Sequence, residues 1–337
     1  MATLPTKAGS VTLLDFANSI DPDGSVAAVA ELLNQRNDVL QDMHWVEGNL
    51  PTGHRSSIRV GLPAPTWRQL YGGVQPSKSL RAQVDDVCGI LEARSEVDKD
   101  LADLNGNAAG FRLSEAAAFL EGMNQAFCQT LFYGDVTANP ERFTGLSSRF
   151  NSSSALNGQN VIKAGGVTAN NNNSIWLIGW SPETIHGIFP KGSKAGLVHE
   201  DLGLIDAFDG SNYRFRAYAD RFQWKCGISV KDWRYVARVC NIDQTVLAVT
   251  SGGDTTGTTY KLVEYMAKLT ARIPNIKACT PVFYVNRTIF EMLRIQAMNK
   301  STYALTLTEG FGQFSTTFMG IPIRLVDQLL STEAIVS

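Results

Sequence analysis

The chain has 337 residues, of which 44% are hydrophobic and 18% are charged, as in a folded protein with a large core. Its 30 lysines and arginines nearly balance 32 aspartates and glutamates, so the net charge of -2 does not indicate a nucleic-acid-binding or membrane-surface protein. We expect no signal peptide and no membrane span, because the N-terminus lacks the first pattern and no stretch is apolar enough for the second. The length predicts two or three subdomains.

The cysteines and histidines are scattered along the chain. Five cysteines form no C-x-x-C pair, and four histidines lie far apart. We therefore expect reduced, buried thiols, a cytosolic place of assembly, no metal site and no cofactor.

Residues 1–45 are predicted to form an arm with one short helix. A turn at residues 21–24 precedes Ser25, which is predicted to cap a helix that continues to about Leu40. The apolar residues of this helix recur at helical spacing: Val26, Val29, Ala30, Leu33 and Leu40. The arm shows no sustained heptads, so we do not expect a coiled coil.

The stretch TWRQLYGGVQPSKSLRAQVDD, Thr66 to Asp86, is predicted to form a hairpin with its turn at Gly72-Gly73. A lone two-stranded hairpin is marginally stable in water, so another surface must cover its apolar side chains. Aromatic residues and arginine are enriched where one protein binds another. The predicted interface residues are Trp67, Arg68, Leu70, Tyr71, Val74, Lys78 and Arg81.

The clearest predicted helix runs from Leu113 to Tyr133, capped by Ser114 or the preceding loop and stopped by Gly134. Gly122 inside this helix costs about 1 kcal/mol relative to alanine, so we expect a close backbone contact there. Residues 149–173 are rich in serine, asparagine and glycine and are predicted to be turns or a mobile surface loop.

Strands dominate the next part of the chain. β-branched and aromatic residues predict strands at 174–180, 184–190, 213–230 and 232–242. Two helices follow, at 260–273 and 287–300, with a short strand at 281–286 between them. The fold class is therefore α+β.

Sequence motifs for catalysis are weak. The loop Gly252–Gly257 has the glycine spacing of a phosphate-binding loop, but Thr258 stands where that loop needs its lysine. We expect an ordinary helix-capping loop there. His199 to Asp201 are predicted to be polar turn residues, and no ordered hydrolase signature is present. We predict that the protein is not an enzyme and has no catalytic residue.

Several longer stretches resemble the major capsid proteins of tailed bacteriophages. Among them are EGNLPTGHRSSIRVGLPAPTWRQLYGGVQPSKS, FRLSEAAAFLEGMNQAFCQTLFYG, GIFPKGSKAGLVHEDLG and QWKCGISVKDWRYVARVCNID. The sequence is most similar to a family from short-tailed phages such as epsilon fifteen, and the resemblance extends from about Leu14 to Val336.

This resemblance implies the Hong Kong 97-type capsid fold. The implied parts are an N-terminal arm at 1–45, an E-loop hairpin at 46–103, a P-domain at 104–245 with a spine helix at 113–133 and long strands, and an A-domain with a C-terminal return at 246–337. In the common form of this fold the long P-domain strands follow the A-domain helices. Here the predicted strands precede those helices, so we hypothesise a permuted connectivity.

The resemblance also implies function. We expect a structural protein that assembles into pentamers and hexamers of an icosahedral shell, which encloses double-stranded DNA in the virion and is built in the host bacterial cytoplasm. The expected partners are other copies of the chain, a separate scaffolding protein and a portal, while a decoration protein is left open. The alternatives are a cellular nanocompartment shell and, more distantly, a nucleotide-binding enzyme.

Overall fold

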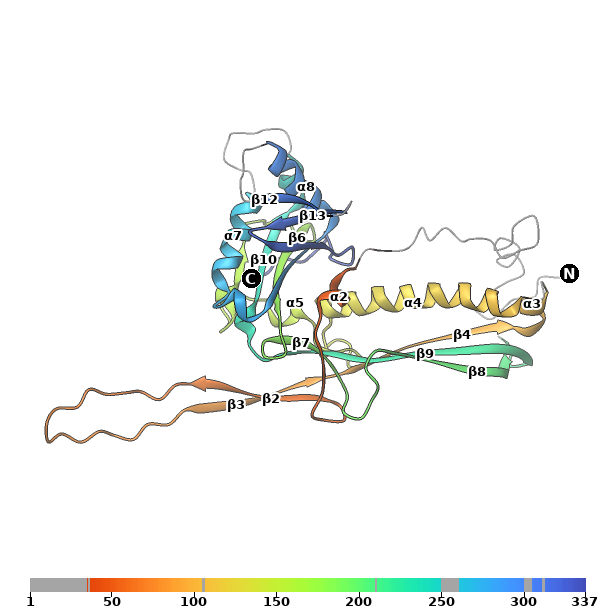
Figure 1. The fold of residues 1–337 in the computed structure, drawn as a ribbon, viewed down its shortest axis with the longest axis horizontal. Helices are drawn as coiled ribbons and strands as arrows, with labels where there is room; N and C mark the ends of the chain where they lie inside the picture. The colour runs from red at the N-terminus through yellow and green to blue at the C-terminus, as the bar shows by residue number, and fades with distance from the viewer. Residues whose placement is uncertain are drawn as a thin grey trace. The chain divides into compact units, whose positions relative to one another are not determined.

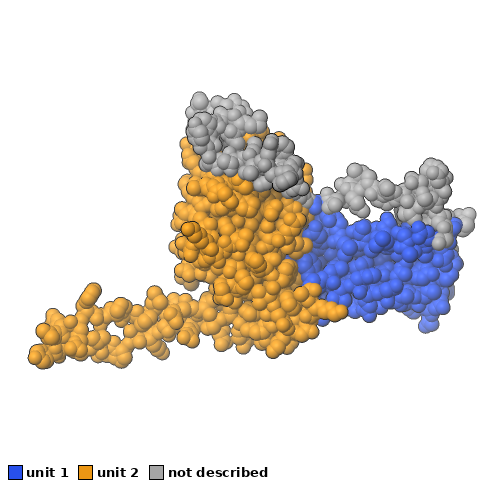
Figure 2. All heavy atoms as spheres, viewed as in Figure 1, with its two compact units in different colours: residues 1–35, 90–127, 196–225 blue, residues 36–89, 128–195, 226–337 orange. Residues whose placement is uncertain are grey.

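The computed structural model describes residues 35, 37–104, 107–209, 211–249, 261–299, 305–310 and 313–337. Figure 1 traces the chain and Figure 2 colours its two compact units. Unit 1 comprises residues 1–35, 90–127 and 196–225, and unit 2 comprises residues 36–89, 128–195 and 226–337.

Unit 1 combines long antiparallel strands with most of a long helix. Its elements are β4 (Gly89–Asp98), α3 (Lys99–Asp103), the first part of α4 (Ala108–Tyr133), β8 (Leu197–Phe208) and the first part of β9 (Arg214–Val230). Strand β9 pairs with β8 on one side and with β4 on the other. The rings of Phe119 and Phe127 in α4 stack on Phe222 and Trp224 of β9, with centroids 6.0 and 4.5 Å apart. The helix therefore packs on this sheet through aromatic contacts.

Local contacts fix both ends of α4. Near its start, the backbone N–H of Gly110 donates to Asn107 Oδ1 at 3.0 Å, so the helix begins five residues before the predicted Leu113. It ends at Tyr133, as predicted. A Cβ on Gly134 would lie 2.3 Å from the carbonyl oxygen of Phe143, so only glycine fits at the stop.

Unit 2 is built around one sheet. Its strands are β1 (Trp45–Glu47), β5 (Val161–Lys163), β6 (Asn172–Trp180), β7 (Ile185–Phe189), β10 (Val236–Asp243), β11 (Thr280–Val285), β12 (Leu305–Gly310), β13 (Gln313–Phe318), β14 (Ile321–Leu325) and the end of β9. The order is β12-β13-β14-β11-β6-β7-β9, while β10 pairs with β6 and β5, and β1 pairs with β7. The helices are α2 (Val39–Asp42), α5 (Leu146–Arg149), α6 (Gln244–Val249), α7 (Leu262–Arg272) and α8 (Arg287–Asn299).

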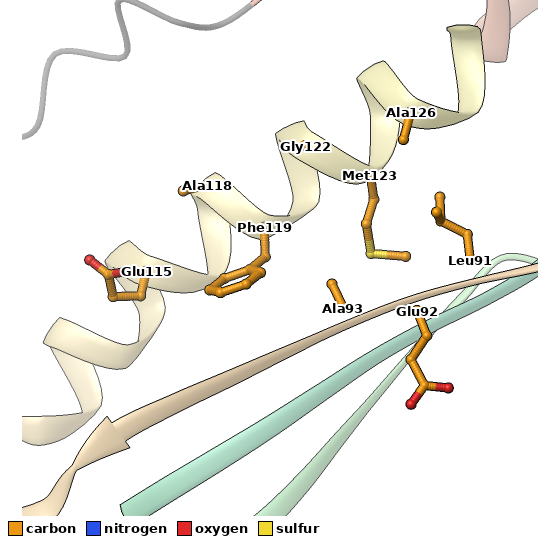
Figure 3. Close-up of a pocket in the computed structure, with 9 residues that line it drawn as sticks. All are labelled: Leu91, Glu92, Ala93, Glu115, Ala118, Phe119, Gly122, Met123 and Ala126. Carbon is orange, nitrogen blue, oxygen red and sulfur yellow. The ribbon is translucent and has the colours of Figure 1, made fainter. Parts of the chain in front are cut away.

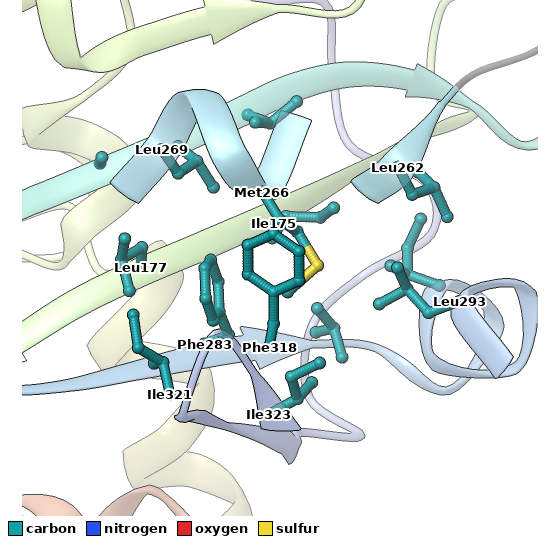
Figure 4. Close-up of a cluster of buried hydrophobic side chains, with 14 of the residues drawn as sticks. Ile175, Leu177, Leu262, Met266, Leu269, Phe283, Leu293, Phe318, Ile321 and Ile323 are labelled. Atoms are coloured by element: carbon teal, nitrogen blue, oxygen red, sulfur yellow. The ribbon is translucent and has the colours of Figure 1, made fainter. Parts of the chain in front are cut away.

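Strand β6 is buried along its whole length because helices cover both faces of the sheet. On one face, Leu262, Met266 and Leu269 of α7 and Leu293 of α8 pack with side chains such as Ile175, Leu177 and Phe283 (Figure 4). On the other face, two phenylalanine rings pack on the ring of Trp176. The ring centre of Phe132, at the end of α4, lies 6.0 Å from that of Trp176, and the ring centre of Phe150, after α5, lies 6.3 Å from it. This is the main hydrophobic core of the described chain.

The asparagine-rich segment at 149–173 consists mostly of turns and irregular chain, as predicted, but it is not all surface loop, because part of it is regular and buried. It contains the 3-10 helix η1 (Gly158–Asn160) and strand β5. The Asn160 side chain is buried and donates to the carbonyl oxygens of residues 233, 234 and 236. Low apolar content misled the prediction, because these amides are buried through hydrogen bonds to the backbone.

Two further local predictions were wrong. His199 to Asp201 lie in strand β8, paired with β9, instead of in a turn. A Cβ on Gly122 would meet no heavy atom within 4 Å, so this glycine makes no close backbone contact. The predicted arm helix lies mostly outside the described residues. Leu40, its predicted end, is helical in α2, but Asn37 just before α2 forms an isolated β-bridge with Val326, so the helix is not continuous up to Leu40.

The order of elements agrees with the order assumed in the permutation hypothesis. In unit 1 the strands that accompany α4 are β4, β8 and β9, and none comes from the C-terminal residues. Strands β8 and β9 precede α7, β11 and α8 in the chain. The outcome that would contradict a permuted connectivity, long strands built from the C-terminal end, is not found among the described residues of unit 1.

Candidate assembly interface

The predicted hairpin is present and belongs to unit 2. Strands β2 (Gly53–Gly61) and β3 (Leu80–Val87) pair with each other as a separate two-stranded sheet. Their antiparallel register runs from Gly53 opposite Val87 to Gly61 opposite Leu80, with an irregularity after Arg59. The hairpin therefore has no third strand in the described chain to protect it.

The base of the hairpin is fixed by charged and hydrogen-bonding groups. Asp86 is buried and accepts from Arg149 Nη2 at 2.7 Å and from the backbone N–H of Val230 at 3.3 Å. Further out, Arg55 and Asp85 form a bidentate pair across the strands, with both distances 2.6 Å. These bonds anchor the base in unit 2 and leave the outer part to extend from it.

The turn lies two residues before the predicted Gly72-Gly73. The chain reverses at Leu70 and Tyr71, and the backbone N–H of Gly72 donates to the carbonyl oxygen of Gln69 at 3.0 Å. Tyr71 has a φ of 64°, in the region that favours glycine. Between strands and turn, the chain continues as two extended segments (Figure 1), joined by a hydrogen bond from Ser77 Oγ to the carbonyl oxygen of Ala64 at 3.2 Å.

All seven predicted interface residues are exposed: Trp67, Arg68, Leu70, Tyr71, Val74, Lys78 and Arg81. Trp67 and Tyr71 expose 104% and 103% of their reference surface, and Leu70 exposes 88%. Four more apolar side chains of the hairpin, Val60, Leu62, Leu80 and Val87, are also exposed. Large apolar side chains gathered on one exposed segment mark a binding surface.

The hairpin also carries charge of one sign. Beyond the Arg55–Asp85 pair, residues 56–84 contain the cations Arg59, Arg68, Lys78 and Arg81 and no aspartate or glutamate. Arg59 lies directly opposite Arg81 in the strand register, a like-charge pairing that is unfavourable in isolation. Sequence reasoning missed Arg59, because a turn at Gly72-Gly73 would place Asp86 opposite it, and only the observed register places Arg81 there.

A second apolar surface lies in unit 1, where α4 and β4 border a groove of about 440 Å³ (Figure 3). Phe119 and Met123 point from the helix towards β4, and Ala118 and Gly122 lie on the same helix. Leu91, Glu92 and Ala93 line the strand side. The open space beside Gly122 is part of this groove.

Chemical sites are not apparent in the described part of the chain. No group of three or more histidine, cysteine, aspartate or glutamate residues is placed there to hold a metal ion. His199 Nε2 lies 2.9 Å from Asp220 Oδ1, and Arg112 pairs with both Asp220 and Asp201. His199 and Asp201 therefore belong to one network of polar and charged side chains. The Gly252–Gly257 loop lies outside the described residues. Among the described helices, none has the length and hydropathy needed to cross a membrane.

Comparison with known proteins identifies the family. A family model described as major capsid protein GP7 matches residues 21–337. The near-atomic structure of bacteriophage epsilon15 is similar at 34% identity and a TM-score of 0.76, covering 99% of this chain and 98% of that chain. No curated protein matches the chain.

One more distant structure shares the fold. The capsid of bacteriophage JBD30 is 9% identical with a TM-score of 0.50, covering 88% of this chain and 92% of that chain, which is a likeness of fold alone. An encapsulin complex from Synechococcus elongatus, at 11% identity and a TM-score of 0.44 over 65% of this chain and 92% of that chain, is too dissimilar to support an inference. The predicted family and fold are confirmed: the chain belongs to the major capsid protein GP7 family of tailed-phage capsid proteins and has the Hong Kong 97-type fold.

Proposed function

We propose that the β2–β3 hairpin is the E-loop of this capsid protein and that its outer half binds a neighbouring copy of the same chain in the shell. The observation that carries this proposal is the exposure of Trp67, Leu70 and Tyr71 at the turn. Fully burying a large apolar side chain is worth about 1.5–3 kcal/mol, so covering this cluster supplies a strong drive for association. The base of the hairpin is fixed in unit 2, and the side chains at its turn remain exposed. We therefore infer that the surface which covers the turn belongs to another copy of the chain.

The charge of the hairpin defines the surface that receives it. Four cations without a nearby carboxylate, including the opposed pair Arg59 and Arg81, favour a partner surface that carries aspartate or glutamate. Rim charges of this kind set the rate and register of docking more than the final affinity. The apolar turn then supplies the buried centre of the contact.

Repetition of this contact builds the shell. The hairpin of each copy contacts a different part of the next copy, so the interface is heterologous and closes into rings when the rotation allows. We infer pentamers and hexamers joined into an icosahedral head. Many linked contacts stabilise such a shell even if each contact is modest.

The shell encloses double-stranded DNA without binding its sequence, and the overall charge of -2 leaves the chain free of a strong basic excess that would hold the DNA. Assembly takes place in the host bacterial cytoplasm with a separate scaffolding protein and a portal, and the chain itself catalyses no reaction.

The domain assignment is also part of the proposal. We assign residues 1–45 to the arm, 46–103 to the E-loop, 104–245 to the P-domain and 246–337 to the A-domain and C-terminal return. Helix α4 is then the spine helix, and the position of β8 and β9 before α7 and α8 makes the connectivity permuted relative to the common form.

The test replaces the apolar turn with charge. The double variant Trp67→Asp and Tyr71→Asp is expected to give folded, soluble subunits or aberrant oligomers in place of closed shells, as seen by electron microscopy and sedimentation. Because both side chains are fully exposed, the far-ultraviolet circular dichroism of the subunit should not change.

The matched control is Gln69→Asp with Gln75→Asp, which adds the same charge to exposed polar positions of the same loop. Closed shells of wild-type stability from the Trp67 and Tyr71 variant would remove the hairpin from the assembly mechanism. Loss of shells in both variants would show that the added charge alone, and not the lost apolar surface, prevents assembly.

A further inference from the structure

The paired strands β2 and β3 form a two-stranded ribbon whose two faces differ in chemistry. In an antiparallel pair, directly opposite residues point to the same face, and successive pairs alternate between the faces. Beyond its base, one face carries the half-buried apolar side chains of Ile58, Ala82 and Val84. The other face, which we call the arginine face, carries three exposed pairs from the base outwards: Arg55–Asp85, Ser57–Gln83 and Arg59–Arg81.

The outermost pair of the arginine face brings two like charges together. Arg59 lies directly opposite Arg81, and residues in this position have Cβ atoms about 4.5–5.5 Å apart. Within the described chain neither guanidinium forms an ion pair. The carboxylate on the same face is that of Asp85, which Arg55 already holds at 2.6 Å. Asp85 also lies four residues from Arg81 along β3, about 13 Å away at 3.3 Å per residue, so it does not neutralise the pair.

The regular pairing of the ribbon ends at these two arginines. The register shifts between Arg59 and Gly61, and beyond Gly61 and Leu80 the chain continues to the turn as two extended segments. Like charges directly opposite each other destabilise an antiparallel pair, and a two-stranded ribbon has little stability to lose. The arginine pair therefore weakens the free subunit, and a local feature that weakens folding is expected where the residues serve a function.

A carboxylate matches this pair chemically. Each guanidinium presents a planar set of N–H donors, and a carboxylate has two oxygens that accept from two such groups at once. One carboxylate between Arg59 and Arg81 replaces their repulsion with two charge-assisted interactions. Both side chains are exposed, so the carboxylate can approach from outside the chain.

A second copy of the chain is the favoured source of this carboxylate. Unit 2 exposes Glu141 and Glu183, and neither forms an ion pair within the described chain. The arginine pair is also continuous with the turn that we assign to the contact between copies. Duplex DNA is disfavoured, because residues 56–84 carry only four cations and the whole chain has a net charge of -2.

We propose that Arg59 and Arg81 together bind one carboxylate of a neighbouring copy, which removes the repulsion between them and stabilises the outer end of the ribbon as the shell forms. This inference rests on the proposed role of the hairpin in assembly. The same two charges weaken the ribbon in the free subunit and strengthen it in the shell.

Neutralising one arginine tests both parts of the proposal. In the free subunit, Arg59→Gln is expected to slow amide hydrogen exchange at residues 57–61 and 80–83 about two- to fivefold, because the repulsion is lost. The same variant is expected to raise the protein concentration needed for shell assembly about tenfold, because the carboxylate loses one of its two partners. Arg81→Gln should reproduce both effects.

The matched control is Arg68→Gln, which removes one exposed cation of the same hairpin outside the paired strands. It should leave the exchange of the ribbon unchanged and affect assembly less than Arg59→Gln does. Unchanged or faster exchange in Arg59→Gln would show that the two arginines do not repel each other in the subunit. An unchanged assembly threshold would show that they bind no carboxylate. Either result overturns the proposal.

Cross-linking identifies the carboxylate. Arg81→Lys places an amine at the pair, and a water-soluble carbodiimide joins that amine to a contacting carboxylate as an amide, taking up the released water as its urea. In shells assembled from a mixture of isotopically labelled and unlabelled chains, peptide mapping is expected to find this amide between two chains. Arg55→Lys is the control and should join Asp85 of the same chain. A product within one chain, or no product, from Arg81→Lys would contradict the proposal, as would slower ribbon exchange when duplex DNA is added to the free subunit.

Failure of this inference is distinguishable from failure of the proposed function. If the Trp67 and Tyr71 double variant forms no shells while Arg59→Gln and Arg81→Gln assemble as the wild type does, only the arginine site is wrong. If that double variant forms normal shells, the hairpin has no role in assembly and both proposals fail.

Discussion

Arg238 and Glu333 form an ion pair inside unit 2, with Nη2 and Oε2 2.8 Å apart and side chains only 2% and 4% exposed. The guanidinium also donates from Nε to Ser174 Oγ at 3.1 Å and from Nη1 to the carbonyl oxygen of Phe150 at 2.9 Å, and it lies 4.8 Å from the centre of the Trp176 ring. The pair therefore ties the last residues of the chain to the centre of the sheet.

Removal of the charge on Glu333 should unfold unit 2 more easily. Glu333→Gln leaves Arg238 charged, buried and without its counter-ion, which costs about 3–5 kcal/mol of the free energy of unfolding. Urea denaturation of the subunit measures this loss. The control Glu264→Gln removes an exposed partner of Lys261 and should cost less than about 0.5 kcal/mol. Equal midpoints for the two variants would contradict a structural role of the buried pair.

Much of the fold could be predicted because its signals are local. The apolar spacing in α4, α7 and α8 predicted their existence and most of their ends. The hairpin was predictable too, since alternating strands around a glycine-rich turn need no tertiary information, although the turn itself lies two residues earlier.

The rest depends on contacts between residues far apart in the sequence. Glu333 lies 95 residues from Arg238, and nothing local marks it as a core residue, because an isolated glutamate is normally exposed. Asn160 was likewise assigned to a surface loop, since its burial depends on carbonyl groups more than 70 residues away. The seven hairpin residues could be named from the sequence as a candidate interface because aromatic residues and arginine stand out there, and the structure shows that they are exposed, whereas Arg59 required the strand register.

Acid should weaken the base of the hairpin through His186. This residue is fully buried in β7, and its ring centre lies 5.8 Å from that of His54 in β2. Burial, then the charge of Lys231 and the neighbouring His54, lower the pKa of His186 from 6.5 to about 4, against the smaller opposing effect of Asp86. The pKa of His54 is lowered as well, chiefly by burial.

Because the pKa of His186 is lower in the folded state, the unfolded chain binds more protons between pH 6.5 and about pH 4. Stability is therefore unaffected by this group above pH 6.5 and falls as the pH decreases towards 4, by about 3 kcal/mol in all. His186→Phe should flatten the dependence of the free energy of unfolding on pH in this window. The half-exposed His199, replaced by glutamine, serves as control. Identical slopes for wild type and His186→Phe would contradict the assignment.

The cations of the hairpin should control the rate of assembly. Arg68→Glu combined with Arg81→Glu reverses two exposed charges on a segment that has no carboxylate between residues 56 and 84. We expect the initial rate of assembly at low salt, followed by light scattering, to fall about tenfold, and the wild-type rate to decrease as salt is added. Arg68→Lys with Arg81→Lys keeps the charge and should assemble at close to the wild-type rate. Assembly that is indifferent to both salt and charge reversal would argue against an acidic receiving surface.

Replacing a glycine inside α4 and the glycine that follows it by alanine should change the free energy of unfolding in opposite directions. Gly122 lies in the interior of α4, where an added Cβ meets open space, so Gly122→Ala should raise the free energy of unfolding of the subunit by about 0.5–1 kcal/mol. Gly134 ends the helix, and a Cβ there would lie 2.3 Å from the carbonyl oxygen of Phe143, so Gly134→Ala should lower it by more than about 1 kcal/mol. Denaturant titration of both variants measures the difference. A loss of stability in Gly122→Ala would mean that the groove face of α4 is packed at residue 122 in the free subunit, contrary to the open space beside it.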